Sequence, residues 1–405
     1  MIFYYITILL IPFGNHPLLS YNAGGITPIK VFGGLALLSA IIEIVGRKNN
    51  GSPFWTPVSK YFMGLMAIVT MSALVNGVSF NSEVLLRFVS IIMFYITTVA
   101  LVNSRERFIR VIMLTVVCMD IAALYMFREY SLYGARYDNF RPSGILGDPN
   151  YTALNLLTMI PVAYFIYKDA TEKNIIIFAV VSLGLYLGAL GLSQSRGGFL
   201  GFAIELILIL IILKFRLRTM LVFGCLLVIL VNFLPVNIMS RFNSDEVGVK
   251  VSTDSRYELL VTGINMFKSN LLFGVGPGNF KQNSDVYNVK ITKKQIAHNS
   301  YLELAAELGI MGIALFLLIA RRTLIDLKRL RESVLDDPQL KSIITGLGVG
   351  IVGYLVAALF LSAEFEKIIW LLIFASAAAT KFVLEAAEEG KLLQAGVENS
   401  LRPGI

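Results

Sequence analysis

This chain has little charge and few of the side chains that usually carry enzyme chemistry. Asp, Glu, Lys and Arg make up 15% of its 405 residues, against about 25% in an ordinary soluble domain. It has two histidines, His16 and His298, and two cysteines, Cys118 and Cys225. So little polar surface cannot cover a soluble globule of this size, which excludes a water-soluble enzyme.

The sequence also has few of the residue patterns that form disulfides or metal sites. Both cysteines lie in apolar stretches, where we expect them to pack rather than to form a disulfide or a metal site. The pattern Asp-x-Asp does not occur, and residues 14–26, which the topology below places outside, contain no acidic residue. Enzymes that use a divalent cation usually hold it with carboxylates, so we expect no metal and no other cofactor.

The chain is rich in apolar side chains: 56% of its residues are hydrophobic. They form runs of roughly 17–21 residues, each long enough to cross about 30 Å of lipid as a helix. We predict an all-α polytopic membrane protein with one transmembrane domain over residues 1–405 and about twelve spans. The predicted spans are 1–20, 27–46, 60–79, 84–102, 108–127, 151–167, 174–193, 197–213, 218–236, 301–320, 342–361 and 368–385.

Basic residues beside the predicted spans occur in alternate loops. Positive residues tend to stay in the cytoplasm, which places both termini and a basic loop at 321–341 there. The largest loop, 237–300, then lies outside, with short helices, between the ninth and tenth spans. The net charge of +8 (35 − 27) is mostly this topology signal and indicates no nucleic-acid partner. The orienting residues are Arg47, Lys48, Arg105, Arg107, Lys168, Lys173, Lys214, Arg216, Arg218, Arg321, Arg322, Lys328, Arg329 and Arg331.

Two outer segments carry arginines beyond what topology requires. Arg141 stands ahead of Asp148-Pro149-Asn150, residues typical of a turn that caps a helix. Ser195-Arg196-Gly197-Gly198 predicts a very tight hairpin between two spans. An arginine at that depth is costly unless it is paired or faces water, and the two glycines let other groups approach closely. The simpler alternative is that Arg196 snorkels to the interface.

The large loop contains Arg256, directly after Asp254-Ser255. Apolar residues follow at helical spacing, which predicts a short amphipathic helix on the membrane surface, capped by Asp254 or Ser255. A cation at a helix start is disfavoured unless an anion joins it, so Arg256 points to a phosphate; an ordinary surface arginine is the alternative. A glycine-rich turn with Gly276 and Gly278 comes next.

His298 ends the loop, just before the tenth span. The pattern Ser300-x-x-Glu303 fits a capping box for that helix, and Gly309 and Gly312 are expected to allow close helix packing. His298 precedes the cap and should project into the aqueous rim, where an imidazole can exchange protons near neutral pH. The alternative bases are Asp148, Glu303 and Glu307.

The motifs around Arg196, Arg256, Gly276 and His298, in this order along the chain, resemble those of the O-antigen ligase and polymerase superfamily. The resemblance covers residues 190–315 and is most specific at its end. It is carried by Ser195-Arg196-Gly197-Gly198, Arg256, Gly274-x-Gly276-x-Gly278-Asn279-Phe280, and His298-Asn299-Ser300 followed by Gly309-x-x-Gly312.

The resemblance implies a metal-independent membrane glycosyltransferase of GT-C-like architecture in the bacterial inner membrane. An O-antigen ligase transfers a glycan from undecaprenyl pyrophosphate to a hydroxyl of the lipid A-core, with inversion, at the outer face. By that analogy Arg196 and Arg256 bind the donor pyrophosphate and His298 activates or orients the acceptor. We name as supporting candidates Arg141, Asn299, Glu303, Gly276 and Gly278.

Three alternatives stay open at this point. A polymerase that extends an O-antigen or exopolysaccharide on its lipid carrier could use the same residues. A transporter of lipid-linked glycans would instead require charged residues through the bilayer midplane. His298 could also bind phosphate without acting as a base.

Overall fold

The computed structural model describes residues 1–15, 27–46, 54–79, 82–137, 140–215, 247–291 and 294–400, with only the helical backbone described for 15, 247–255 and 386–400. Within these ranges the chain is helical and forms no strand. The predicted span at 218–236, His16 and Cys225 lie outside the described residues.

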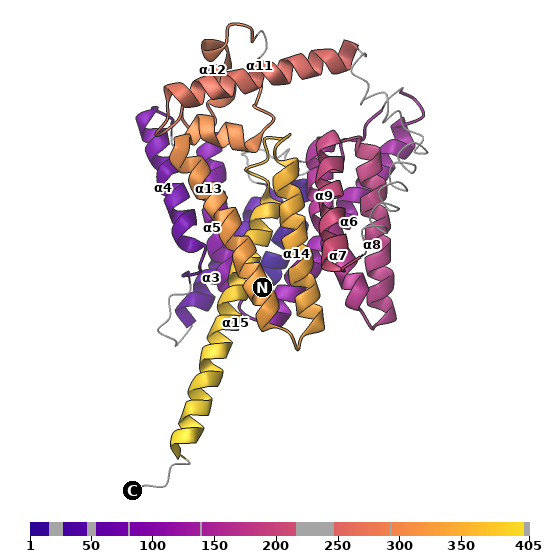
Figure 1. The fold of residues 1–405 in the computed structure, drawn as a ribbon, viewed down its shortest axis with the longest axis vertical. Coiled ribbons are helices and arrows are strands. Elements are labelled where there is room, and N and C mark those ends of the chain that lie inside the picture. The colour runs from indigo at the N-terminus through magenta and orange to yellow at the C-terminus, as the bar shows by residue number, and fades with distance from the viewer. Residues whose placement is uncertain are drawn as a thin grey trace.

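Most of the described helices stand side by side in one bundle (Figure 1). Seven of them are long and apolar enough to cross a membrane, which confirms a multi-pass, all-helical membrane protein. These seven are α3 (Pro28–Gly46), α5 (Glu83–Leu101), α6 (Arg105–Tyr133), α8 (Lys173–Ser193), α13 (Ser300–Ser333), α14 (Pro338–Ala357) and α15 (Lys367–Ser400). Beside them lie α4 (Ser59–Val75), α7 (Pro149–Asp169) and α9 (Arg196–Ile212).

The start of the chain differs from the predicted span at 1–20. Residues 1–15 form two short helices, α1 (Ile2–Leu9) and the 3-10 helix η1 (Pro12–Asn15). Proline has no backbone N–H to donate, and its ring clashes with the preceding turn, so Pro12 begins a new helix rather than continuing α1.

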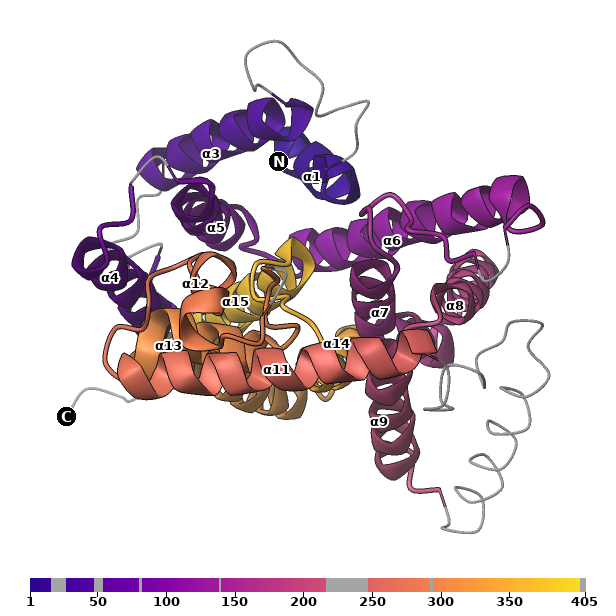
Figure 2. The ribbon, with the colours of Figure 1, turned by 90° about the horizontal axis from the view of Figure 1, so that it is seen from above.

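Two helices lie across one end of the bundle, which we call the α11 end. They are α11 (Val247–Ser269) and α12 (Phe280–Tyr287), and α11 runs from above α13 past α14 to the end of α9 (Figures 1 and 2). The surface helix predicted from the sequence is therefore present but longer. It begins at Val247, so the predicted cap at Asp254 or Ser255 is wrong.

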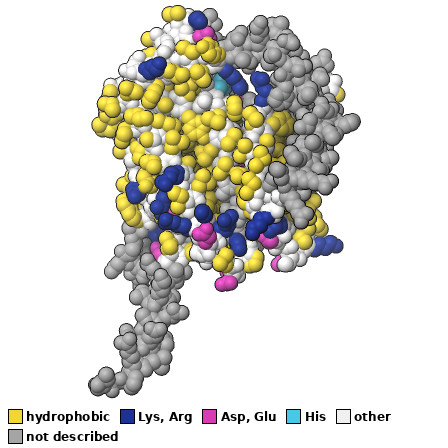
Figure 3. Space-filling model, viewed as in Figure 1, with side chains coloured by type: hydrophobic (Ala, Val, Ile, Leu, Met, Phe, Trp, Pro, Cys, Tyr) yellow, Lys and Arg dark blue, Asp and Glu magenta, His cyan; other side chains and the backbone are white. Residues whose placement is uncertain are grey.

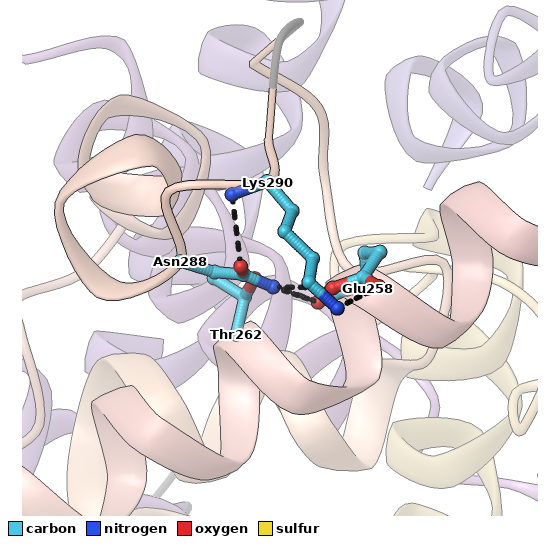
Figure 4. A network of polar contacts seen from close by, with 4 residues as sticks. All are labelled: Glu258, Thr262, Asn288 and Lys290. Carbon is cyan, nitrogen blue, oxygen red and sulfur yellow. Dashed lines mark hydrogen bonds and ion pairs between the residues drawn. The ribbon is translucent and has the colours of Figure 1, made fainter.

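The chain after α12 folds back onto α11 through a polar network (Figure 4). The Asn288 amide donates to the Glu258 carboxylate over 2.8 Å and to the Glu258 carbonyl over 3.1 Å. The Lys290 ammonium lies 3.4 Å from the same carboxylate. The Asn288 hydrogen bond, then Lys290, lowers the pKa of Glu258. This network fixes the segment that leads toward His298.

Gly309 has a different role from the one predicted. Its φ of +70° is not helical and breaks α13, so that the first turns of α13 bend away from its long membrane part (Figure 1). The Gly309 backbone also packs against the Leu272 carbonyl, where a side chain would not fit. The expectation of simple helix packing at Gly309 is therefore wrong, because the position needs a left-handed backbone.

Glycines in α14 set its close packing against α7. A Cβ at Gly350 would overlap the Thr158 carbonyl oxygen, and one at Gly346 would lie 2.7 Å from the Val162 Cα. Small residues of this kind let two backbones approach within a membrane, where van der Waals packing drives helix association.

We predict that Gly350→Ala lowers the free energy of unfolding by about 1–3 kcal/mol, because the added methyl group overpacks the α7–α14 contact. Thermal unfolding in detergent micelles measures the effect. Gly348→Ala is the matched control, since nothing lies within 4 Å of a Cβ at that position of the same helix. Equal melting temperatures for the two variants would contradict this account of the packing.

Candidate functional site

The hairpin between α8 and α9 is as tight as the sequence predicts. Gln194 adopts a left-handed φ of +50° and ends α8. Ser195 then caps α9, and its hydroxyl accepts the Gly198 N–H over 3.3 Å. Arg196 is consequently the first residue of α9, at the positive end of the helix dipole. A cation and a helix N-terminus coincide there, an arrangement that favours an anion.

The glycines after Arg196 allow the close approach expected of them. A Cβ at Gly197 would lie 3.0 Å from the Phe360 Cβ, and one at Gly198 would lie 3.2 Å from the Ala153 Cβ. The start of α9 therefore fits tightly between α7 and the α14–α15 loop, residues 358–366.

A small polar cavity of about 110 Å³ lies at this point of the α11 end. Arg141 forms part of its wall and is held in place, since its Nε donates to the Ser193 carbonyl over 2.9 Å and its Nη2 to Asn150 Oδ1 over 3.0 Å. The cavity is lined by Arg141, Asn150, Gln194, Ser195, Arg196, Gly197, Arg256, Phe360 and Leu361.

Arg256 reaches the same cavity from α11. Its side chain is half-buried, and burial, followed by the positive charge of Arg196, lowers the pKa of Arg256. The structure thus brings together two arginines that are 60 positions apart in the chain (256 − 196). The argument from the helix dipole does not apply to Arg256, which lies well inside α11 rather than at its start.

His298 lies next to this pair but does not line the cavity itself. Its backbone has a left-handed φ of +52°, which turns the chain immediately before α13. Burial and then the charge of Arg256 lower the pKa of His298, against a smaller opposing effect of Asp148. Figure 3 shows the histidine beside Lys and Arg side chains at the α11 end, above a broad band of hydrophobic side chains.

The residues after His298 are structural, although not in the way the capping box predicts. Asn299 caps α13, and its side chain accepts the Leu302 N–H over 3.0 Å. Ser300 instead donates to the Leu361 carbonyl and accepts the Ala363 N–H, each over 2.7 Å. Glu303 accepts the Ala297 N–H over 3.2 Å and the Ser362 hydroxyl. The predicted capping box is therefore wrong, because Ser300 and Glu303 bond to the α14–α15 loop and to the chain before His298.

The α14–α15 loop is the part of the site that sequence reasoning missed. It supplies Phe360 and Leu361 to the cavity and is held by Ser300 and by Tyr151, whose hydroxyl donates to the Ser362 carbonyl over 2.7 Å. Asn150 and Gln194 were also missed as lining residues. The one available signal was the pair of glutamates, Glu364 and Glu366, in an otherwise mostly apolar loop; burial raises the pKa of both.

The glycine-rich turn supports the site from a distance. Gly276 and Gly278 have φ values of +98° and +77°, and neither lines the arginine cavity. The Glu307 carboxylate accepts the Gly278 N–H over 2.7 Å and the Phe280 N–H over 3.0 Å. These bonds join the turn after α11 to the first turns of α13.

Comparison with known families gives one match. Residues 179–317 match the family described as O-antigen ligase, a range that begins in α8, ends in α13 and includes both arginines and His298. The superfamily resemblance seen in the sequence is thereby confirmed. No curated protein matches the chain.

We predict that Arg256→Gln raises the pKa of His298 toward its ordinary value of about 6.5, because the variant removes the nearby positive charge. Nuclear magnetic resonance of labelled histidine in a His16→Gln background reads out His298 alone. Lys294→Gln serves as the control, since the exposed Lys294 pairs with Asp285 and does not contribute to the pKa shift of His298. An unchanged titration in Arg256→Gln would contradict the proximity of the two groups.

Proposed function

We propose that this chain, which carries a domain of the O-antigen ligase and polymerase superfamily, is a metal-independent glycosyltransferase, an O-antigen ligase. It takes a glycan from undecaprenyl pyrophosphate and transfers it to a hydroxyl of the lipid A-core, inverting the anomeric centre. The α11 end faces the outer side of the bacterial inner membrane, and both termini lie in the cytoplasm.

One observation carries the proposal: Arg196 and Arg256 line one small cavity, and His298 lies within electrostatic reach of Arg256, although the three residues come from separate segments. Like charges in such a place repel, and the N-terminus of α9 adds to the positive potential. An anion relieves this repulsion. Pyrophosphate suits it well, because guanidinium groups bind phosphate oxygens with paired, charge-assisted hydrogen bonds.

In the proposed reaction, an acceptor hydroxyl oxygen attacks the anomeric carbon of the donor. The bond from that carbon to the phosphate oxygen breaks, and the electron pair leaves with undecaprenyl pyrophosphate. Arg196 and Arg256 stabilise the charge that builds on the leaving group. The acceptor proton passes to the His298 imidazole, whose lowered pKa favours the neutral form that can receive it.

The alternative bases each accept structural hydrogen bonds. Asp148 caps α7, accepting the Asn150 N–H over 2.7 Å. Glu303 accepts the Ala297 N–H and Glu307 the N–H groups of the glycine-rich turn. His298 forms no hydrogen bond through its ring to another described residue, so its nitrogens are available to a substrate. This supports the histidine as the base.

We predict that His298→Ala and Arg196→Ala each reduce transfer by about 10²–10⁴-fold, the usual contribution of a positioned base or charge stabiliser. Purified protein is given an undecaprenyl-pyrophosphate glycan together with either lipid A-core or a second lipid-linked glycan. Glycan on lipid A-core supports the ligase; longer lipid-linked chains alone would reject it in favour of a polymerase.

Two controls complete this experiment. Lys294→Ala removes an exposed cation from the same end of the molecule and should leave transfer unchanged, since surface ion pairs contribute little. Wild-type turnover should persist in excess EDTA, because the arginines supply the charge that a metal would otherwise provide. Loss of turnover that Mg²⁺ restores would contradict the metal-independent mechanism.

The pH dependence separates the two roles open to His298. Its pKa in the free protein lies below the ordinary value, so the imidazole is neutral at pH 7 and becomes charged as the pH falls. If it is the base, kcat/KM, which reports the free enzyme, decreases as the pH falls through that pKa. A kcat/KM that instead rises on acidification would identify His298 as a phosphate ligand.

A further inference from the structure

A second cavity lies on the other side of α15 from the arginines. It encloses about 250 Å³ between α1, α3, α5 and α15, slightly below the roughly 300–1,000 Å³ of ordinary ligand pockets. In Figure 2 these helices lie together, away from α9 and the adjoining end of α11. No residue lines both cavities. Its wall is mainly hydrocarbon, with Ile11, Ile29, Ile91, Met93, Phe94 and Trp370 among the lining residues.

Two lysines stand together at one end of this hydrocarbon cavity. Lys30 belongs to the first turn of α3 and Lys367 is the first residue of α15. Their charges repel each other, and Arg87 adds to the repulsion, whereas Glu366 attracts Lys367. Glu366 is shared, because its carboxylate also accepts a 2.8 Å hydrogen bond from Asn155. Among the charged groups that act on Lys367, the two cations Arg87 and Lys30 outnumber the one carboxylate of Glu366, and two helix N-termini add positive potential.

The wall of the cavity is also partly exposed. Lys30 and Gly34 line it and are exposed, and only 11% of the apolar window of α3 is buried. The neighbouring α1 has eight helical residues and rises only about 12 Å, less than half of the hydrocarbon thickness. A lipid chain beside α1 would extend the wall that the described residues form at this short helix.

We propose that this cavity holds one acyl chain of an anionic phospholipid, with the lipid phosphate between Lys30 and Lys367. The hydrocarbon wall accepts the chain, and the two ammonium groups select a negatively charged headgroup over a zwitterionic one. The lipid packs α1 and α3 against α5 and α15. This inference does not depend on the proposed transferase activity, because the site shares no residue with the arginine cavity.

The test uses Trp370, which lines the cavity and is 2% exposed. The chain has two tryptophans, so Trp55→Phe leaves Trp370 as the only one. The full-length protein is placed in phosphatidylcholine vesicles that contain either phosphatidylglycerol or phosphatidylcholine with brominated acyl chains. At equal content of brominated lipid, brominated phosphatidylglycerol should quench Trp370 fluorescence more strongly than brominated phosphatidylcholine does. Bulk lipid of either kind does not reach this buried ring.

Variants of the two lysines test the preference for an anionic headgroup. Lys30→Gln and Lys367→Gln should each weaken the binding of phosphatidylglycerol about fivefold, the contribution of one lysine near an anionic lipid. Lys30→Arg and Lys367→Arg keep the charge and should keep the preference, which separates loss of binding from misfolding. Equal quenching by the two lipids, or glutamine variants that bind like the parent protein, would overturn the proposal.

A glycine in the wall tests the cavity itself. Gly34→Leu should abolish quenching, because nothing lies within 4 Å of a Cβ at this lining position and the new side chain occupies the space. Gly184→Leu in α8 is the matched control, as its Cβ also meets nothing within 4 Å, and quenching should be unaffected. Quenching that persists in Gly34→Leu would show that the bromine reaches Trp370 by another route and would reject this site.

Discussion

Repulsion between like charges is the constraint around which the α11 end is organised. Arg196 and Arg256 meet at one cavity, and His298 lies within electrostatic reach of Arg256. The interaction between these like charges does not hold the three side chains together, so neighbouring elements must position them. Ser195 fixes the start of α9, the Glu258 network fixes the chain after α12 against α11, and a left-handed residue fixes the turn before α13. In the proposed function, a bound anion relieves this repulsion.

The framework that resists this repulsion depends on backbone conformations rather than on further charges. Gly309 breaks α13, and its first turns then contact both the glycine-rich turn and the α14–α15 loop. Glu307 and Ser300 make those two contacts through N–H and carbonyl groups. The acidic residues that accept such bonds support the shape of the site, and in the proposed reaction the histidine takes the proton.

Both cavities carry basic side chains, but the two proposals assign them different ligands. The arginine cavity is small and polar, and in the proposed function its guanidinium groups hold a pyrophosphate in one orientation. The lysine-ended cavity is larger and apolar, and its ammonium groups suit a lipid headgroup at an interface. The start of α15 and the loop before it separate them. A lipid that stabilises α1 and α3 would therefore act on the bundle and not on the reacting atoms.

The sequence alone determined the membrane class, the positions of most spans, the tight hairpin at Arg196 and the superfamily, because long apolar runs and short ordered motifs are local properties of the chain. It also indicated Arg196, Arg256 and His298 as candidate site residues, but the structural roles that it predicted for some neighbouring residues were wrong. Capping and packing roles at Asp254, Ser300 and Gly309 were misassigned. Only the tertiary structure decided these, because Ser300 bonds to a loop some sixty positions away and Gly309 packs on a carbonyl of another segment. Contacts between distant segments leave no periodic pattern in a sequence. The role of the α14–α15 loop and the apolar cavity between α1, α3, α5 and α15 therefore emerged only from the tertiary structure.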